Sequence, residues 1–414
     1  MAKIAVLGHG VVGSGVVELC HKNHDSIVKK AGREIEVKRI LDLREFPDLP
    51  YADKFTKNFD DILNDDEISI VVEVMGGLTP AYDYVKASLQ KKKSVVTSNK
   101  ELVAAKGAEL LAVAKENNVN FFFEASVGGG IPIIRPLHQC LAANEIKEIA
   151  GILNGSTNFI LTKMIREQMS FEAALKLAQE LGYAERNPAA DVEGADACRK
   201  ICILASLAYG MHVYPEHVYT EGITKMTLED VAYAESWGGV IKLIGRAKVL
   251  DDGKLLVMVH PAFIAGDSQL AGIDDVFNGI MVRGDATGDV VFYGKGAGKL
   301  PTASAVVADV IDVAKATKTN PTLTWVDTHE NIVVDHMQTS VSFFLRCLSA
   351  DEDYAEKLVE QCFGKVQMLS RPDMAKGELG FITPVLSEQK VYDSIQFLKE
   401  NNVDVLSAIR VLDY

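Results

Sequence analysis

The chain has 414 residues, of which 48% are hydrophobic and 24% are charged, and its formal net charge at pH 7 is -14. The length predicts two or three domains with substantial cores, and the composition excludes disorder over any long stretch. The acidic charge argues against a general nucleic-acid-binding or anionic-membrane surface, because both partners are negatively charged.

The sequence shows no sign of export or of a transition-metal centre. Its start, MAKIAVLGHG, lacks the features of a signal peptide, and no run approaches the ~20 apolar residues of a membrane span. We therefore expect a soluble, cytoplasmic protein. The six cysteines are dispersed, and Cys198 and Cys202 are expected to be buried thiols rather than zinc ligands.

Residues 1–133 alternate apolar runs with helical patterns. The runs that predict strands are KIAVL at 3–7, IEVKRILDL at 35–43, SIVVEVM at 69–75, SVVTS at 94–98 and NFFFEAS at 120–126. Strands that alternate with helices predict a parallel sheet covered on both faces. The expected fold class is therefore α/β, with a Rossmann-type, doubly wound first domain.

The first predicted strand leads into GHGVVG, in which Gly8, Gly10 and Gly13 form a GxGxxG turn ahead of a helix. Gly8 permits the tight turn, Gly10 lets the backbone approach a pyrophosphate, and Gly13 lets helix and strand pack closely. The amides of Val11 and Val12 at the helix N-terminus then face the phosphates. This placement favours dinucleotide binding over a merely structural turn.

The choice of dinucleotide depends on the end of the second strand, where ILDLRE offers both Asp42 and Arg44. An acidic residue there hydrogen-bonds a ribose 2′-hydroxyl, whereas an arginine accommodates a 2′-phosphate. The sequence leaves NAD and NADP both open. His9, in the glycine turn, is expected to be a bystander rather than a catalytic residue.

The rest of the chain predicts two further domains. Residues 134–300 combine helices with later strands, such as LLVMVHPAFI, and form an α+β domain. The apolar-faced helix at about 301–318 is expected to return to the first domain, which makes the cleft between domains the natural ligand site. Residues 336–414 follow the order β-α-β-β-α-β of a small ferredoxin-like module.

Six further segments, together with the glycine turn, resemble homoserine dehydrogenase. They are EVMGG at 73–77, VVTSNKELVA at 95–104, EASVGGGIPII at 124–134, LNGSTNFIL at 153–161, GYAERNPAADVEGADACRK at 182–200 and GKGAGKLPTASAVVAD at 294–309. The resemblance implies reversible, NAD(P)-dependent interconversion of L-homoserine and L-aspartate 4-semialdehyde in threonine, methionine and isoleucine biosynthesis. It also implies a monofunctional enzyme, since no aspartate kinase segment precedes the turn. A homodimer or homotetramer joined through the sheet of the substrate-binding, catalytic domain is expected.

The segment DVEGADACRK at 191–200 places acids and a base in an otherwise apolar helix. If the segment is helical, Glu193, Asp196 and Lys200 lie on one stripe beside an apolar stripe. From the spacing alone, a surface pair of Asp196 and Lys200 is favoured, worth only a few tenths of a kcal/mol. The resemblance implies instead that Lys200 is the principal acid/base of the reaction.

The chemistry of the reaction suits a lysine. Hydride delivery to the aldehyde leaves charge on the carbonyl oxygen, so a cationic acid both stabilises that charge and supplies the proton. Burial or a second cation is expected to lower the pKa of Lys200 toward working pH. The resemblance implies that Lys100 is this cation, beside substrate and nicotinamide. It also implies that Asp196 orients Lys200 or a bridging water at the substrate, and that Glu185 holds the substrate's ammonium group.

Weaker candidates come from the same resemblance. Thr157 and the amides around Gly296 are implied substrate contacts, with simple turn roles equally open. Gly76 and Gly296 are implied cofactor contacts together with Lys100.

The stretch EASVGGGIP carries a further implication. In the family, backbone carbonyls of such a loop hold a sodium ion, which corresponds here to Glu124, Val127, Gly129 and Ile131. Backbone oxygen suits a hard cation. A glycine-rich structural turn is an equally open interpretation, and an ion here is expected to be structural.

The tail resembles an ACT domain, a module that often binds amino-acid effectors between subunits. The loop after its first strand reads LSADEDYAEK and lacks the glycine that permits a close backbone approach to a ligand. This argues against feedback control by threonine, and dimerisation is at least as good a role for the module.

Two other hypotheses fit the glycine turn. A related reductase of another short aldehyde would not need Glu185, Asp196 and Lys200 together, and a dinucleotide-sensing regulator would lose one or both lysines. The chain keeps all of these residues. The sequence therefore favours the dehydrogenase.

Overall fold

The computed structural model describes residues 1–315 and 323–414. The chain divides into two compact units. Unit 1 comprises Met1–Lys147, Arg199–Pro215 and Val282–Asn331, and unit 2 comprises Glu148–Cys198, Glu216–Met281 and Ile332–Tyr414. The domain bounds expected from the sequence stay predictions. In the described parts of the chain, no helix is long and apolar enough to cross a membrane.

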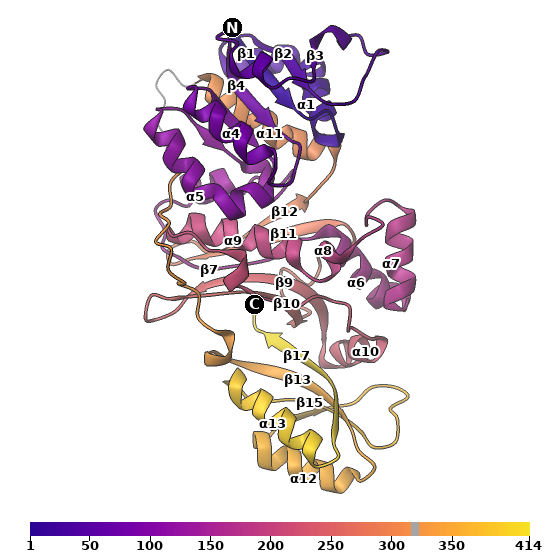
Figure 1. Cartoon of the computed structure of the whole chain (residues 1–414). Coiled ribbons are helices and arrows are strands. Elements are labelled where there is room, and N and C mark those ends of the chain that lie inside the picture. Colours follow the sequence, from indigo (N-terminus) through magenta and orange to yellow (C-terminus); the bar gives the residue numbers. More distant parts are fainter. Residues whose placement is uncertain (316–322) are drawn as a thin grey trace. The chain divides into compact units, whose positions relative to one another are not determined.

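Unit 1 contains a six-stranded sheet with helices on both faces (Figure 1). The strands are β1 (Ala2–Leu7), β2 (Ile35–Leu41), β3 (Phe55–Thr56), β4 (Ile68–Glu73), β5 (Ser94–Thr97) and β6 (Phe121–Phe122). They pair in parallel in the order β3-β2-β1-β4-β5-β6, which is the Rossmann order and confirms the predicted fold class. Strand β3 is not among the predicted strands, because two residues carry no apolar periodicity.

The helices of this part of the chain bury apolar faces against the sheet. They are α1 (Val11–Lys22), α2 (His24–Ala31), α3 (Asp60–Leu63), α4 (Ala81–Gln90), α5 (Lys100–Glu116) and α11 (Lys299–Lys315). Figure 1 shows α11 beside β4 and α1, and Val306 shares a core with Ile4 of β1. A Cβ at Gly15 would lie 2.9 Å from the carbonyl oxygen of Lys299, so glycine permits this close packing. Residues 316–318 of the expected returning helix lie outside the described residues.

A second, mixed sheet has the order β12-β11-β7-β9-β10-β17-β13-β15-β14, with β8 beside β10. Its strands outside the tail are β7 (Ile146–Ile152), β8 (Tyr219–Thr220), β9 (Gly239–Val249), β10 (Leu255–Ala265), β11 (Phe277–Gly284) and β12 (Gly288–Lys295). The helices of the same region are α6 (Gly155–Glu167), α7 (Phe171–Glu180), α8 (Ala189–Val192), α9 (Ala195–Tyr209) and α10 (Leu228–Trp237). Strands β9 and β10 are antiparallel over their whole length, and their almost continuous burial explains their apolar sequences.

A turn at Gly194 separates α8 from α9. Gly194 has φ +90°, and a Cβ there would lie 3.0 Å from Cγ2 of Thr220, so the position suits glycine alone. The expected helical stripe is therefore wrong at its first member, because Glu193 follows α8 and is exposed. Asp196 and Lys200 remain one turn apart within α9.

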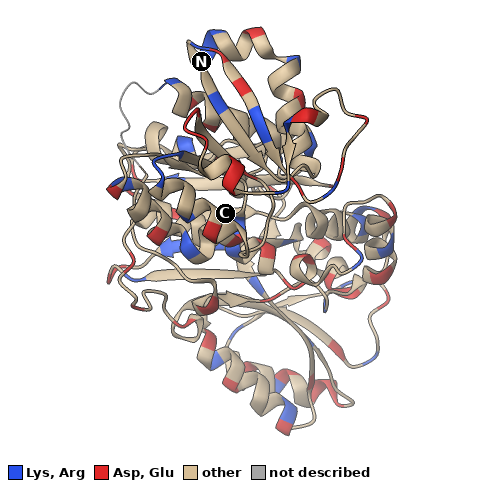
Figure 2. Ribbon diagram, turned by 45° about the horizontal axis from the view of Figure 1, so that its top comes forward, with Lys and Arg blue, Asp and Glu red and all other residues tan. Residues whose placement is uncertain are grey.

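The tail has the predicted β-α-β-β-α-β order. Its elements are β13 (Ser340–Leu348), α12 (Glu352–Phe363), β14 (Gln367–Leu369), β15 (Glu378–Ile382), the short β16 (Leu386–Ser387), α13 (Glu388–Glu400) and β17 (Asp404–Leu412). Strands β17, β13, β15 and β14 pair antiparallel in that order, as in a ferredoxin-like module. Phe343, Phe381 and Leu398 belong to a hydrophobic core of the tail itself. Basic and acidic residues are interspersed on the surfaces of its helices (Figure 2). Its identity as an ACT domain stays a prediction.

Candidate active site

The glycine turn leaves open space at the N-terminus of α1. Gly8 has φ +96°, and a Cβ at Gly13 would lie 1.9 Å from the Gly8 carbonyl oxygen, so neither position accepts a side chain. At Gly10, by contrast, a Cβ would have no described atom within 4 Å apart from its chain neighbours and the backbone of its own helix. The first amides of the helix, at Val11 and Val12, need acceptors from outside it. The turn thus fits the pyrophosphate of a dinucleotide.

Asp42 and Arg44 pair at the end of β2. The Arg44 Nε and Nη2 atoms lie 3.0 and 2.9 Å from the Asp42 carboxylate, which also accepts the His9 amide hydrogen at 2.8 Å. The hydrogen bonds from Arg44 hold the pKa of Asp42 well below its usual range. The Arg44 side chain is 63% exposed and lies over the Phe46 ring. The carboxylate is therefore already engaged, whereas the guanidinium remains accessible.

His9 lies within an aromatic cluster. Its ring is packed against Phe46, Tyr51 and Phe55, and burial lowers its pKa. This environment agrees with a structural rather than a catalytic residue.

A buried carboxylate, Glu73, organises the next loop of the parallel sheet. It ends β4, where it accepts hydrogen bonds from the Met75 and Gly76 amides at 2.8 and 3.2 Å and from the Thr97 hydroxyl at 2.6 Å. Burial raises its pKa. The hydrogen bond from its amide to Glu73 therefore positions Gly76, a predicted cofactor contact. Gly76 has φ +79°, in the left-handed region that favours glycine.

Lys100 begins α5 at the carboxyl end of β5. Asn99 caps this helix by accepting the Leu102 amide hydrogen at 3.1 Å, and it donates to the Gly77 carbonyl oxygen at 2.6 Å. The half-buried Lys100 therefore lies at the same edge of the sheet as the glycine turn. Sequence reasoning missed Asn99 and Glu73, although both lie in segments that carry the resemblance.

The strongest polar cluster of unit 2 is centred on Asn154. This residue caps α6 by accepting the Thr157 amide hydrogen at 2.8 Å. Its amide nitrogen donates to Asp191 at 2.7 Å and to Asp196 at 3.0 Å. One side-chain amide thus holds two carboxylates, of which Asp196 is 4% exposed. The sequence alone does not single out Asn154 or Asp191, because these two hydrogen-bond partners lie 37 residues apart along the chain.

Lys200 lies one helical turn after Asp196. The lysine is 7% exposed, so the interpretation of these two residues as a surface pair is wrong. Burying an ammonium and a carboxylate on one helix is unfavourable unless each has a partner. Cys198 and Cys202 on the same helix are buried thiols, as expected.

Two other predicted substrate contacts have different surroundings. Glu185 is exposed in the loop between α7 and α8, where its carbonyl oxygen accepts a hydrogen bond from Gln179 at 3.0 Å. Thr157 is 1% exposed, and its hydroxyl donates within the cap to Asn154 Oδ1 at 3.0 Å. This agrees with the turn role that the sequence left open for Thr157.

The loop that contains the predicted cation ligands packs against the segment around Gly296. The Glu124 carboxylate accepts the amide hydrogens of Ile133, Ile134 and Arg135 at 2.6 to 2.8 Å, so an ion at this residue would be held by its carbonyl oxygen. A Cβ at Gly129, which has φ +56°, would lie 2.2 Å from the Gly296 carbonyl oxygen. Across residues 1–315 and 323–414, no group of three His, Cys, Asp or Glu side chains could hold a metal ion.

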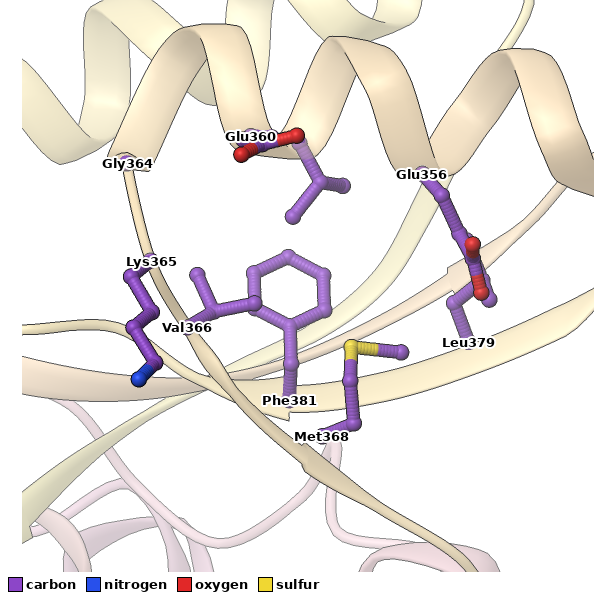
Figure 3. A pocket seen from close by; sticks show the side chains of 9 residues that line it. Glu356, Glu360, Gly364, Lys365, Val366, Met368, Leu379 and Phe381 are labelled. Atoms are coloured by element: carbon purple, nitrogen blue, oxygen red, sulfur yellow. The ribbon is translucent and has the colours of Figure 1, made fainter.

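A pocket of about 250 Å³ in the tail contains none of these candidates (Figure 3). It is lined by Glu356, Val359, Glu360, Gly364, Lys365, Val366, Met368, Leu379 and Phe381. Figure 3 shows the Phe381 ring beside Val366, with Glu356 and Glu360 on the side of α12. It is therefore separate from the candidate site.

The chain is similar to known proteins of a single family. Residues 8–124 match the family described as "Homoserine dehydrogenase, NAD binding domain", and residues 132–311 match "Homoserine dehydrogenase". The homoserine dehydrogenase of Synechocystis sp. is 47% identical over 319 residues, which are 75% of this chain and 73% of that protein. That of Bacillus subtilis is 43% identical over 317 residues, covering 76% of this chain and 73% of that protein.

Solved structures are similar as well. A homoserine dehydrogenase from Thiobacillus denitrificans has a TM-score of 0.88 and 35% identity, with 100% of this chain and 98% of that one covered. A hyperthermophilic archaeal homoserine dehydrogenase in complex with NADPH has a TM-score of 0.66 and 30% identity, with coverage of 77% and 99%.

Proposed function

The chain belongs to the homoserine dehydrogenase family, and we propose that Lys200 is the acid/base of its reaction, with Lys100 as a second cation. The enzyme is an NAD(P)-dependent oxidoreductase that interconverts L-homoserine and L-aspartate 4-semialdehyde reversibly. The bound dinucleotide supplies or accepts the hydride. The chain's own side chains move the proton and hold the substrate.

The buried pair on α9 carries this proposal. In reduction, the Lys200 ammonium donates a proton to the carbonyl oxygen of the semialdehyde as negative charge develops there. In oxidation, the amine accepts the hydroxyl proton of homoserine. Asp196, one turn earlier and also buried, orients Lys200 or a bridging water. Lys100 adds positive charge for the same oxygen.

The carboxylates beside Asn154 are the proposed anchor for the substrate's ammonium group. An ammonium leaves water only where carboxylates replace its hydration, and Asp191 and Asp196 are held together by one amide at 2.7 and 3.0 Å. Glu185 contributes a third carboxylate from its loop. Asp191 is an addition to the residues expected from the sequence. Thr157 supports this arrangement through the cap of α6.

The dinucleotide binds at the glycine turn, through Gly8, Gly10 and Gly13 and the amides that follow, and Gly76 and Gly296 are further proposed contacts. Arg44 is placed to accept the 2′-phosphate of NADP. Its guanidinium is exposed, while Asp42 is already engaged with Arg44 and the His9 amide. We therefore propose a preference for NADP over NAD.

The remaining proposals concern the assembly. A structural monovalent cation would be held by the carbonyl oxygens of Glu124, Val127, Gly129 and Ile131, a donor set that suits a hard ion. From the family alone, we also propose a homodimer or homotetramer in the cytoplasm, which light scattering and cell fractionation test.

The decisive experiment is an assay of homoserine oxidation with NAD and NADP separately, in the native enzyme and in Lys200→Met. The substitution should lower kcat by about 10²- to 10⁴-fold, the usual contribution of a general acid or base, with little change in the KM of the dinucleotide. A native enzyme without turnover, or a variant with unchanged kcat, would contradict the proposal.

Lys93 offers a matched control. It is also a buried lysine, 4% exposed, and its ammonium donates to the carbonyl oxygens of Asp65 and Ile68 at 2.6 and 2.8 Å. Lys93→Met should destabilise the fold but retain kcat. An equal loss of kcat in both variants would show a structural effect rather than catalysis by Lys200.

A further inference from the structure

Arg410 on β17 is a buried arginine that links the tail to the strands beside it. It is 1% exposed, and its Nε and Nη2 donate to the Glu388 carboxylate at 3.0 and 2.6 Å. Its Nη1 donates to Glu221 at 3.2 Å, and the Tyr219 hydroxyl donates to the same carboxylate oxygen at 3.1 Å. The guanidinium also lies 4.9 Å from the centroid of the Tyr219 ring. The buried Arg410, which belongs to the tail, and the half-buried Tyr219 therefore hold Glu221.

The backbone after Glu221 contacts the turn between α8 and α9 without spare room. A Cβ at Gly222 would lie 2.1 Å from the Val192 carbonyl oxygen and 2.4 Å from Cα of Glu193. The Ile223 amide donates to that same carbonyl oxygen at 2.8 Å. A displacement of this backbone toward the turn, or one that breaks this hydrogen bond, would therefore disturb the turn.

The turn also determines where two carboxylates of the proposed site lie. Asp191 precedes it and Asp196 follows it, and both accept hydrogen bonds from Asn154. The N-terminal end of α9 starts from the turn through the hydrogen bond of the Cys198 amide to the Gly194 carbonyl oxygen at 2.9 Å. The turn is therefore the shared support of the substrate carboxylates.

We infer that Arg410 is a positioning residue for homoserine binding. It fixes Glu221, and the contact at Gly222 transmits this constraint to the turn that carries Asp191 and Asp196. The tail thereby sets the geometry of the substrate site without touching the substrate. This inference rests on the proposed role of the two carboxylates in binding.

The test compares Arg410→Lys and Glu221→Gln with the native enzyme. Each substitution should raise the KM of homoserine about 3- to 10-fold, the range expected for coupling through a packed network, while the KM of the dinucleotide stays within about twofold. The double variant should be little worse than the worse single variant, because both break one path. A purely structural role would not separate the two KM values.

Arg346 on β13 provides the matched control. It is another buried arginine of the tail, 8% exposed, with Nε 3.2 Å from Asp230 and Nη2 3.2 Å from Thr227, and neither partner is Glu221 or a residue of the turn. Arg346→Lys should lower the unfolding temperature without changing the KM of homoserine. An equal rise in this control overturns the inference.

Failure of the inference is distinguishable from failure of the proposed site. If Asp196→Asn raises the KM of homoserine while Arg410→Lys and Glu221→Gln do not, the substrate site stands and the role of Arg410 is overturned. If Asp196→Asn also leaves that KM unchanged, the substrate site itself fails, and the inference fails with it. Should Arg410→Lys not fold, the Glu221→Gln variant decides the question. Glutamine is similar in size to glutamate, and the Glu221 side chain is 27% exposed.

Discussion

The glycine turn and the turn before α9 show two ways of building a binding site. The first consists of backbone, with open amides at a helix N-terminus and a space where Gly10 lacks a side chain. The second consists of buried polar side chains, with Asn154 holding Asp191 and Asp196. The backbone site depends on local chain geometry, whereas the side-chain site depends on partners from distant segments.

This difference implies different responses to substitution. The backbone site should fail when an added atom fills its space, because its donors do not depend on side chains. The side-chain site should fail when a partner is removed, because a buried carboxylate without a donor is unfavourable. The two kinds of change should therefore separate dinucleotide binding from homoserine binding.

The largest effect is expected for Gly13→Ala. Its Cβ would lie 1.9 Å from the Gly8 carbonyl oxygen, so the turn must open. We expect the free energy of unfolding to fall by about 1–3 kcal/mol, as for other overpacked positions, and dinucleotide affinity to fall about 10- to 100-fold. Urea unfolding and a fluorescence titration with the dinucleotide measure the two quantities.

Gly10→Ala is the matched control for this prediction. Since the new Cβ would have no described atom within 4 Å apart from its chain neighbours and the backbone of its own helix, the free energy of unfolding should stay within about 0.5 kcal/mol of the native value. Dinucleotide affinity should still fall, because the methyl group occupies the approach of the pyrophosphate. Equal destabilisation by both substitutions would contradict the distinction between packing and access.

Asn154→Ala should have the next largest effect. It removes the cap of α6 and the donor to two carboxylates, so the free energy of unfolding should fall by about 1–3 kcal/mol. The KM of homoserine should rise, while the dissociation constant of the dinucleotide stays unchanged. Steady-state kinetics and chemical unfolding test both.

Ser170→Ala controls for the loss of a cap alone. Ser170 caps α7 by accepting the Ala173 amide hydrogen at 3.2 Å, and it has no part in the proposed site. Its loss should lower the free energy of unfolding by about 1 kcal/mol and leave the KM of homoserine unchanged. If Asn154→Ala does no more than this, the carboxylates do not depend on Asn154.

The same difference explains what the sequence could predict. The positions of Gly8, Gly10 and Gly13 follow from local backbone requirements, so a short motif after an apolar run predicts both the Rossmann fold and the turn. The spacing of Asp196 and Lys200 also follows from the local sequence, because residues four apart in a helix lie one turn apart.

The remaining features depend on tertiary contacts. The break at Gly194 is set by its packing against Thr220, which an apolar pattern does not record. The partners of Asn154 lie 37 and 42 residues away, so its local sequence indicates only a helix cap. The burial of Lys200 likewise comes from the fold, and this is why spacing alone favoured a surface pair.

A smaller effect is expected for Arg44→Ala. Loss of the exposed guanidinium should raise the KM of NADP about tenfold, equivalent to about 1.4 kcal/mol, while the KM of NAD changes little. Asp42 would then be released from its pair with Arg44 and could meet a ribose hydroxyl. Parallel changes in the two KM values would show that Arg44 does not distinguish the dinucleotides.

The smallest effect is expected for the pH dependence of the free energy of unfolding, through a buried side chain of unit 2. His260 on β10 is completely buried, with Nδ1 2.8 Å from the Pro261 carbonyl oxygen, and burial holds its pKa well below its ordinary value. Nearby Arg410 acts in the same direction. The folded enzyme therefore keeps this ring neutral, whereas the unfolded chain takes up a proton near pH 6.5.

The sign of the pH effect follows from this difference. The contribution of neutral His260 to the free energy of unfolding is complete above about pH 6.5. It decreases as the pH falls below this value, by at most about 1.4 kcal/mol per pH unit. Urea unfolding between pH 7.5 and 5.5 measures the slope. His260→Phe should reduce the slope of the free energy of unfolding against pH by the contribution of one titrating group. A residual slope should remain in the variant, because the pKa values of His9 and His336 are also lowered. An unchanged slope in His260→Phe would show that this ring does not remain neutral in the folded state.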